Sequence, residues 1–149
     1  MAKAARLPDP GPSACTAMRV RKAARRVTQI YDAHLAPFGL TITQYGLLGR
    51  IKAFDGLGIG ELAEKMLMDP TTLTRSLRPL QRRGLLVLAA DPRDKRSRSL
   101  HLTDRGRAAF DAARPGWQQA QRHIVATLGE RQTAALHAAL DRMVDRLAD

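Results

Sequence analysis

The chain has 149 residues, of which 25 are Lys or Arg and 14 are Asp or Glu, so its formal net charge is +11. Hydrophobic residues make up 44% of it, too many for a disordered polycation and enough for one packed domain. The single cysteine, Cys15, excludes an intramolecular disulfide framework and favours a cytoplasmic protein. No apolar run reaches the roughly 18 residues of a membrane helix, and residues 1–12 lack the apolar stretch of a signal peptide, so we expect no membrane partner.

The positive charge lies in two blocks. Residues 1–30 and 71–98 each carry a net charge of +6, whereas residues 31–70 carry −2 and residues 99–149 carry +1. A surface that only solubilises a protein mixes the two signs more evenly. The block at 71–98 lies inside the folded part of the chain and favours a polyanionic partner.

A helix is expected near the N-terminus, after an irregular arm. Residues 1–12 hold three prolines and a glycine, so we expect a flexible arm there. Apolar residues at helical spacing then predict a helix over about 13–36, with Ser13 as its cap. Pro37 and Gly39 end it, because proline interrupts a helix and glycine adopts the left-handed conformation that follows one.

Two more helices are expected next. Thr41 or Thr43 caps the first. Its predicted apolar side consists of Ile42, Tyr45, Leu48, Ile51 and Phe54. Residues 55–56 form a turn and residues 57–59 a short extended piece before the second. The residues predicted to point inward from the second helix are Leu62, Ala63, Met66 and Leu67.

A fourth helix is marked clearly at both ends. Asp69 is a favourable N-cap, Pro70 fits the first turn, where no N–H is needed, and Gly84 suits a left-handed C-terminal position. At about 100° per residue, one face of this helix is made of leucines. They are Leu73, Leu77 and Leu80. The opposite face carries Thr71, Arg75, Arg78 and Arg82.

A hairpin and two long helices complete the chain. Residues 85–90 and 99–102 alternate as strands around a polar turn. Thr103 caps a long helix, and a last helix follows it. The apolar positions are Phe110, Ala113, Trp117, Ala120, Ile124 and Leu128 in the first, and Leu136, Leu140, Met143, Val144 and Leu147 in the second.

This order of elements predicts a mainly α fold with a small β-hairpin, a winged helix-turn-helix over about 41–103. Hydroxyl and guanidinium groups held outward by leucines suit the major groove, because Thr contacts phosphate or a thymine methyl and Arg chelates guanine. The N-terminal part of the fourth helix is expected to contact DNA through Thr71, Thr72, Thr74, Arg75 and Arg78. The alternative, a cationic face that only meets solvent, leaves the basic hairpin turn unexplained.

The hairpin turn provides a second candidate contact with DNA. Its basic side chains are Arg93, Lys95, Arg96 and Arg98. Arginine inserted into a narrow minor groove reads its shape rather than the identity of the bases. Asp94 repels phosphate, so we assign it a structural role in the wing, where it holds a neighbouring guanidinium or caps the turn.

Two motifs of this region resemble the multiple-antibiotic-resistance regulator (MarR) family. Residues 91–98 read DPRDKRSR and residues 102–106 read LTDRG, which is similar to the family's D-x-R-D-x-R wing followed by L-T-x-x-G. Three upstream segments also resemble the family. Residues 40–45 resemble the start of its second helix, residues 73–77 its recognition helix, and residues 85–86 the entry to its wing.

The resemblance covers roughly residues 15–148 and implies a MarR-type domain over 13–149. It implies a homodimer joined by helices at about 13–36 and 104–148, bound to a near-palindromic operator in double-stranded DNA. It also implies a repressor that is released by a small, often aromatic or phenolic, anion. No cofactor is expected.

Pro79 lies inside the predicted fourth helix. There it removes one backbone hydrogen bond and favours a kink, at a cost of about 3 kcal/mol if unrelieved. It follows the positions assigned to base reading, so a kink would redirect residues 80–83 and leave those positions in place.

The first helix and the last two carry more apolar surface than three short helices and a hairpin can cover. Unburied helical faces of this length predict a second copy of the chain. A two-fold dimer places its recognition helices about one DNA turn apart, roughly 34 Å. The alternative is an antiparallel bundle within a monomer.

In the family that this chain resembles, ligands bind where the dimerisation helices meet the DNA-binding lobe. The matching regions offer a phenol, an imidazole and basic side chains that can bind an organic carboxylate. The candidates are Tyr31, His34, Tyr45, Arg19 and Arg50. The alternative for both tyrosines is core packing, because each lies on an apolar face.

A hydroperoxide-sensing branch of the family keeps a reactive cysteine and two tyrosines, so a cysteine-based redox sensor is another alternative. In this chain Tyr31 matches one of the two tyrosines, but Ile42 occupies the position of the second. Cys15 is shifted by about half a helical turn from the position of the reactive cysteine. Both differences favour an inert thiol. The four histidines are too scattered in the sequence for a metal site.

The sequence therefore predicts a ligand-responsive transcriptional repressor. The alternative is a constitutive or architectural DNA-binding protein without an effector, whose binding depends steeply on salt and little on sequence. An enzyme is not expected, because the sequence shows no nucleophile–base pair, phosphate loop or metal cluster.

Overall fold

The computed structural model describes residue 11, residues 15–91, residue 94 and residues 98–148. Its elements are α1 (Thr16–Leu35), η2 (Ala36–Phe38), α2 (Ile42–Ala53), α3 (Ile59–Lys65), α4 (Pro70–Arg82), β1 (Leu86–Ala90), β2 (Arg98–Leu102), α5 (Asp104–Leu128) and α6 (Glu130–Arg146). This order, with one antiparallel hairpin, confirms the predicted winged helix-turn-helix. Within the described ranges, no helix is long and apolar enough to cross a membrane.

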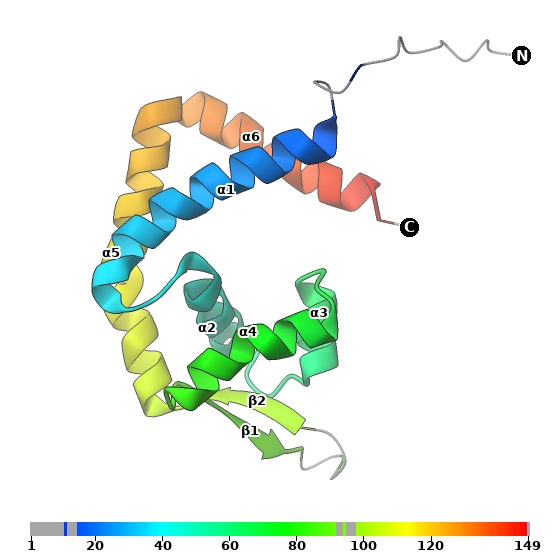
Figure 1. Ribbon diagram of the computed structural model, residues 1–149, viewed down its shortest axis with the longest axis vertical. Coiled ribbons are helices and arrows are strands. Elements are labelled where there is room, and N and C mark those ends of the chain that lie inside the picture. The colour runs from blue at the N-terminus through cyan, green and yellow to red at the C-terminus, as the bar shows by residue number, and fades with distance from the viewer. Residues whose placement is uncertain (1–10, 12–14, 92–93, 95–97, 149) are drawn as a thin grey trace, which may run out of the picture.

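Helix α5 connects the two parts of the molecule (Figure 1). At one end it packs against the lobe formed by α2, α3, α4 and the hairpin, and toward the other end it is crossed by α1 and followed by α6. The crossing with α1 is close: a Cβ atom on Gly116 would lie 2.5 Å from the carbonyl oxygen of His34. Glycine at this position therefore lets the two helix backbones meet.

The ends of α4 follow the predicted signals. The Asp69 side chain accepts a hydrogen bond of 3.0 Å from the backbone N–H of Thr72, and Gly84 has a left-handed φ of +68°. The helix continues through Pro79 to its last turn, and Leu80 is fully buried. Pro79 therefore leaves the path of α4 helical to its end.

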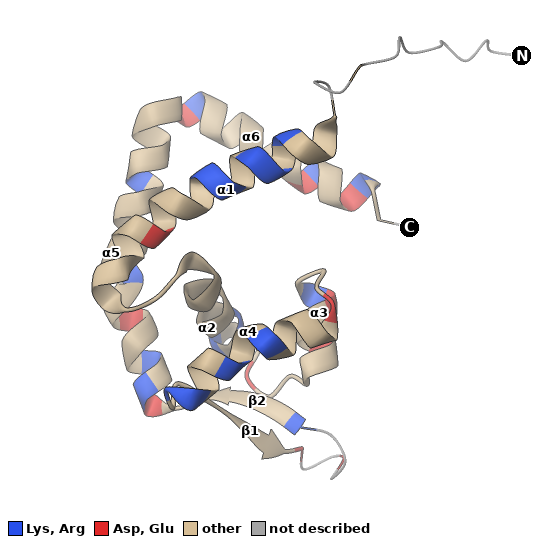
Figure 2. Ribbon diagram, viewed as in Figure 1, with Lys and Arg blue, Asp and Glu red and all other residues tan. Residues whose placement is uncertain are grey.

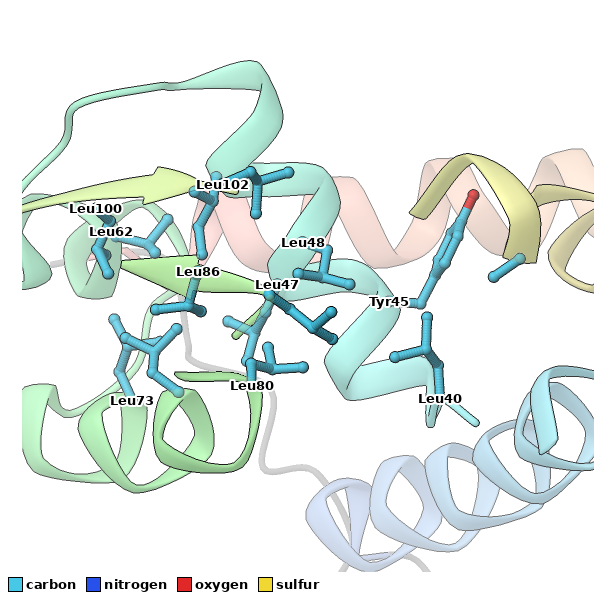
Figure 3. Close-up of a cluster of buried hydrophobic side chains, with 14 of the residues drawn as sticks. Leu40, Tyr45, Leu47, Leu48, Leu62, Leu73, Leu80, Leu86, Leu100 and Leu102 are labelled. Atoms are coloured by element: carbon cyan, nitrogen blue, oxygen red, sulfur yellow. The ribbon is translucent and has the colours of Figure 1, made fainter. Parts of the chain in front are cut away.

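Buried leucines from α2, α3, α4 and the hairpin form the core of the lobe (Figure 3). They include Leu47, Leu48, Leu62, Leu73, Leu80, Leu86, Leu100 and Leu102. In the hairpin, Leu86 pairs with Leu102 and Leu88 with Leu100, which places these side chains on one face. The predicted leucine face of α4 is confirmed, and its burial turns the opposite face of the helix to solvent.

The start of α5 is fixed by the residues of the L-T-x-x-G motif. The Thr103 hydroxyl donates to the carbonyl oxygen of Gly84 at 2.6 Å and accepts from the N–H of Gly106 at 3.0 Å. A Cβ atom on Gly106 would lie 1.9 Å from the carbonyl oxygen of Leu85. The threonine and the glycine thus allow α5 to dock directly on the entry to the wing.

Two predicted core residues are exposed. Phe54 is 37% exposed because α2 ends at Ala53, and the Lys65 ammonium lies 4.8 Å from its ring centroid. Leu67 is 77% exposed and follows the end of α3 with a positive φ of 51°, so it has left the helical register. The prediction for both side chains was wrong, and fully buried Leu47 was missed.

Of the two predicted caps of α2, the structure has Thr41, and helix α1 begins later than the predicted residue 13. Thr41 caps α2, since its hydroxyl accepts from the N–H of Gln44 at 3.2 Å and the Gln44 side chain accepts from the N–H of Thr41. Helix α1 begins at Thr16 with Cys15 as its N-cap residue. The predicted cap Ser13, like most of the expected arm, lies outside the described residues.

Candidate nucleic-acid interface

Basic residues recur along α4 (Figure 2), and the threonines and arginines that the sequence predicts there are mostly exposed. Thr71, Arg75 and Arg78 are exposed and line a shallow hollow together with Pro70 and Thr74. The Asp69 cap and the buried leucines hold this face in one orientation. Since Arg75 and Arg78 are long side chains exposed on this face, they can reach the edges of bases in a groove.

Two threonines of α4 take part in hydrogen bonds within the helix. The Thr74 hydroxyl donates to the carbonyl oxygen of Pro70 at 2.8 Å, so it can accept from a partner but has already used its proton. Thr72 offers its backbone N–H to Asp69, and its carbonyl oxygen accepts from the hydroxyl of Ser76 at 3.0 Å. All five predicted positions lie on the N-terminal two-thirds of α4.

The wing is described only at its base. Arg93, Lys95 and Arg96 lie outside the described residues. Arg98 is exposed and opens β2, opposite Ala90 of β1. The N–H of Asp94 donates to the carbonyl oxygen of Asp91 at 3.2 Å.

Arg83, the residue that follows α4, has a partner in another part of the chain. The Arg83 guanidinium donates to the carbonyl oxygen of Gly39 at 2.8 Å, which links the end of α4 to the junction between α1 and α2. A local sequence signal could not reveal this contact, because its partners are 44 positions apart. Arg82, one residue earlier, is exposed.

A second candidate site lies at the crossing of α1 and α5. The Tyr31 hydroxyl donates to Oε1 of Gln121, and burial raises the pKa of Tyr31. His34 Nε2 lies 3.5 Å from His123 Nδ1. Both histidines line a hollow of about 200 Å³, with Arg26, Gln29, Ile30 and Ala33.

The other three predicted ligand residues lie elsewhere. Tyr45 is 7% exposed and stacks on Phe110 at 4.6 Å between ring centroids, and desolvation by burial raises its pKa. Arg19 lines an open groove on the outward face of α1, and Arg50 is exposed in the last turn of α2. Tyr31 and His34 thus both contact α5 from the last half of α1, but only His34 lines the hollow, and Arg19, Tyr45 and Arg50 lie apart from it.

The pair of His34 and His123 was missed in the sequence, where the two residues stand 89 positions apart. Among the described residues, no group of three or more His, Cys, Asp or Glu side chains is placed to hold a metal ion. Cys15 is a free, exposed thiol at the start of α1.

Comparison with known proteins identifies relatives of this arrangement. A sequence profile of the MarR family matches residues 38–97. The transcriptional regulator MosR of M. tuberculosis, solved in complex with DNA, is 34% identical with a TM-score of 0.76, over 89% of this chain and 97% of MosR. The transcriptional repressor CouR, solved on a 23-mer DNA duplex, is 28% identical with a TM-score of 0.81, over 89% of this chain and 94% of CouR.

A curated relative matches over a shorter stretch. The HTH-type transcriptional regulator SarZ of Staphylococcus epidermidis is 30% identical over 83 residues, which is 56% of this chain. The match spans 56% of the length of SarZ, which is little more than half.

Proposed function

The chain belongs to the MarR family, and from that premise we propose that it is a DNA-binding transcriptional regulator, a homodimeric repressor that a small aromatic or phenolic anion releases from a near-palindromic operator. The observation that carries the proposal is the outward face of α4, where Arg75 and Arg78 are exposed on a helix seated by buried leucines. Its DNA-bound relatives MosR and CouR support it.

In this proposal α4 enters the major groove and the wing follows the neighbouring minor groove. Arg75 and Arg78 chelate guanine O6 and N7, and the α4 threonines contact phosphate or thymine methyl groups. The proposed wing contacts are Arg93, Lys95, Arg96 and Arg98. Asp94 keeps the structural role expected from the sequence.

A competition experiment tests sequence-specific binding. A labelled duplex carrying the promoter of the chain's own gene is bound, and unlabelled promoter or random duplex of equal length displaces it. A sequence-specific repressor requires far more random duplex than promoter for displacement. Equal displacement, with a steep salt dependence, would support the constitutive or architectural alternative.

The exposed apolar side chains of the long helices support the dimer. They are Met18, Val20, Val27, Leu128, Leu136, Leu140, Val144 and Leu147. Their exposed fractions run from 38% to 76%, and large apolar patches of this kind mark interfaces. In a two-fold dimer the same surface of each copy is buried, and two α4 helices face the DNA together.

Leu140→Glu is expected to disrupt the dimer. A charge inserted in a hydrophobic interface costs about 2 kcal/mol or more, which raises the dimer dissociation constant roughly thirtyfold. Light scattering over a concentration series measures it. Ala138→Glu is the matched control, because about 200° separates positions 138 and 140 on an α-helix. A wild-type chain that is monomeric throughout, or equal effects of the two variants, would contradict the dimer.

The hollow between α1 and α5 is the proposed ligand site. Tyr31, three residues before His34 on α1, donates the proton of its hydroxyl to Oε1 of Gln121, so this oxygen can still accept a hydrogen bond from the hydroxyl of a phenolic ligand. Arg26 supplies a positive charge, and His34 and His123 supply further polar atoms. An aromatic acid fits these groups, since its ring packs on Ile30 and its anion meets the donors.

Tyr31→Phe is expected to raise the concentration of 4-hydroxybenzoate needed for half-maximal release of DNA by about three- to tenfold, since the oxygen that accepts from the ligand hydroxyl is removed. Binding of DNA without ligand stays unchanged. The probes are benzoate, 4-hydroxybenzoate and their thioesters, first selected by thermal shift. Tyr45→Phe is the matched control, and a larger effect of this control would place the ligand at Tyr45 instead.

A further inference from the structure

A histidine at the base of the wing bridges the hairpin and the loop that precedes α3. His101 of β2 has its Nε2 atom 2.9 Å from the Ser99 hydroxyl oxygen and its Nδ1 atom 3.1 Å from Oδ1 of Asp55. Ser99 is only 3% exposed, whereas the His101 side chain is 33% exposed and the Asp55 side chain is 52% exposed. The three side chains form one chain of contacts from strand to loop.

Donor and acceptor chemistry assigns the proton positions in this chain of contacts. A carboxylate only accepts, so Nδ1 of His101 donates to Asp55. Nε2 then either accepts from the hydroxyl of Ser99 or donates to its oxygen, and in both cases the buried hydroxyl has a partner. The imidazole ring thus serves both partners at once through two nitrogens held at a fixed separation.

The backbone joins the same two segments. The N–H of Leu100 donates to the carbonyl oxygen of Leu57 at 2.8 Å, and the N–H of Gly56 donates to the carbonyl oxygen of Leu100 at 3.0 Å. Strand β2 thus lies between β1 on one edge and this loop on the other. A Cβ atom on Gly56 would lie 3.6 Å from Cε1 of His101, so the loop packs directly against the imidazole ring.

Ser, His and Asp in this order also occur in hydrolases, and the pair of Ser99 and His101 was not recognised in the sequence. Here the serine hydroxyl is almost completely buried, so a substrate cannot reach it. The arrangement is therefore suited to holding structure. These contacts fix the start of strand β2, whose first residue, Arg98, directly precedes Ser99.

We propose that His101 is a positioning residue for DNA binding: by linking Ser99 to Asp55 it fixes the direction in which strand β2 leaves the lobe, and so sets how Arg98 meets the DNA backbone. This inference rests on the proposed function for its effect on DNA. It concerns phosphate contacts and leaves base recognition to α4.

The experiment compares His101→Phe, which removes both hydrogen bonds, with His101→Gln, whose amide can replace Nε2, and His101→Asn, whose amide can replace Nδ1. His137→Gln on exposed α6 is the matched control. Each protein is titrated with the promoter duplex over a salt series, and amide exchange of Leu100 is measured without DNA.

We expect His101→Phe to bind the promoter about three- to tenfold more weakly, with a salt slope smaller by about 0.9 for each phosphate that the wing no longer neutralises. The ratio of affinities for promoter and mutated promoter stays unchanged. The amide of Leu100 exchanges faster, and Gln or Asn restores part of both effects. His137→Gln behaves like wild type.

An unchanged salt slope in a folded His101→Phe protein would overturn the positioning role, and so would a lack of any rescue by Gln and Asn. Failure of the wild-type chain to bind duplex DNA contradicts the proposed function instead. In that case the amide exchange rate of Leu100 alone tests the link between strand and loop. An unchanged rate in His101→Phe would overturn this link.

Discussion

Arg75→Ala is expected to weaken operator binding by about 1–3 kcal/mol and to relax the base preference at one position of each half-site. The Arg75 side chain is exposed on the first half of α4, four residues after Thr71 and on the same face. The substitution removes two hydrogen bonds to one guanine and leaves phosphate contacts in place. Binding to the operator and to single-base variants of it measures both effects.

Arg82→Ala is the matched control for Arg75. It removes the same side chain from the last turn of α4, where the helix ends and base edges are out of reach in a helix-turn-helix docked by its N-terminal part. We expect it to lower affinity for all sequences alike, with a salt slope reduced by about 1. A uniform decrease for Arg75→Ala as well would assign both arginines to phosphate.

Gly106→Ala is expected to destabilise the fold by about 3 kcal/mol or more. The added Cβ atom would lie 1.9 Å from the carbonyl oxygen of Leu85 and 2.9 Å from its carbonyl carbon. Because backbone atoms cannot turn aside as a flexible side chain does, α5 must move away from the wing entry. This also breaks the bond from Gly106 N–H to Thr103. Urea unfolding followed by circular dichroism measures the decrease in stability.

Gly46→Ala makes the same substitution in α2, where an added Cβ atom meets nothing within 4 Å. Since alanine favours the helix, this control is expected to stabilise the protein by about 0.5–1 kcal/mol. A Gly106→Ala protein as stable as wild type would contradict the close docking of α5. Equal destabilisation in both variants would show that the position of the glycine is immaterial.

Helix α4 could be predicted almost completely, because its signals are local. Asp69, Pro70 and Gly84 mark its ends, and the leucine period separates its two faces. Each of these effects acts within one or two helical turns. The same holds for the Thr103 cap, although the reason for Gly106 in that motif, a backbone contact with Leu85, needed the structure.

The contacts that join distant segments could not be predicted from the chain. His34 meets His123 across 89 positions, and His101 meets Asp55 across 46. Neither pair leaves a periodic pattern in the sequence, since each depends on how whole helices and strands dock. Tyr45 shows the same limit: its apolar face was evident, but only the stack on Phe110 separates a core side chain from a ligand site.

Dimethyl sulfate footprinting tests the central claim most directly, because the reagent methylates guanine N7 in the major groove, where Arg75 and Arg78 are proposed to bind. We expect two sets of protected guanines in the operator, about 10–10.5 base pairs apart, one for each α4 of the dimer. Arg75→Ala removes protection at one guanine of each set. Bound protein that leaves every guanine N7 reactive would contradict the account.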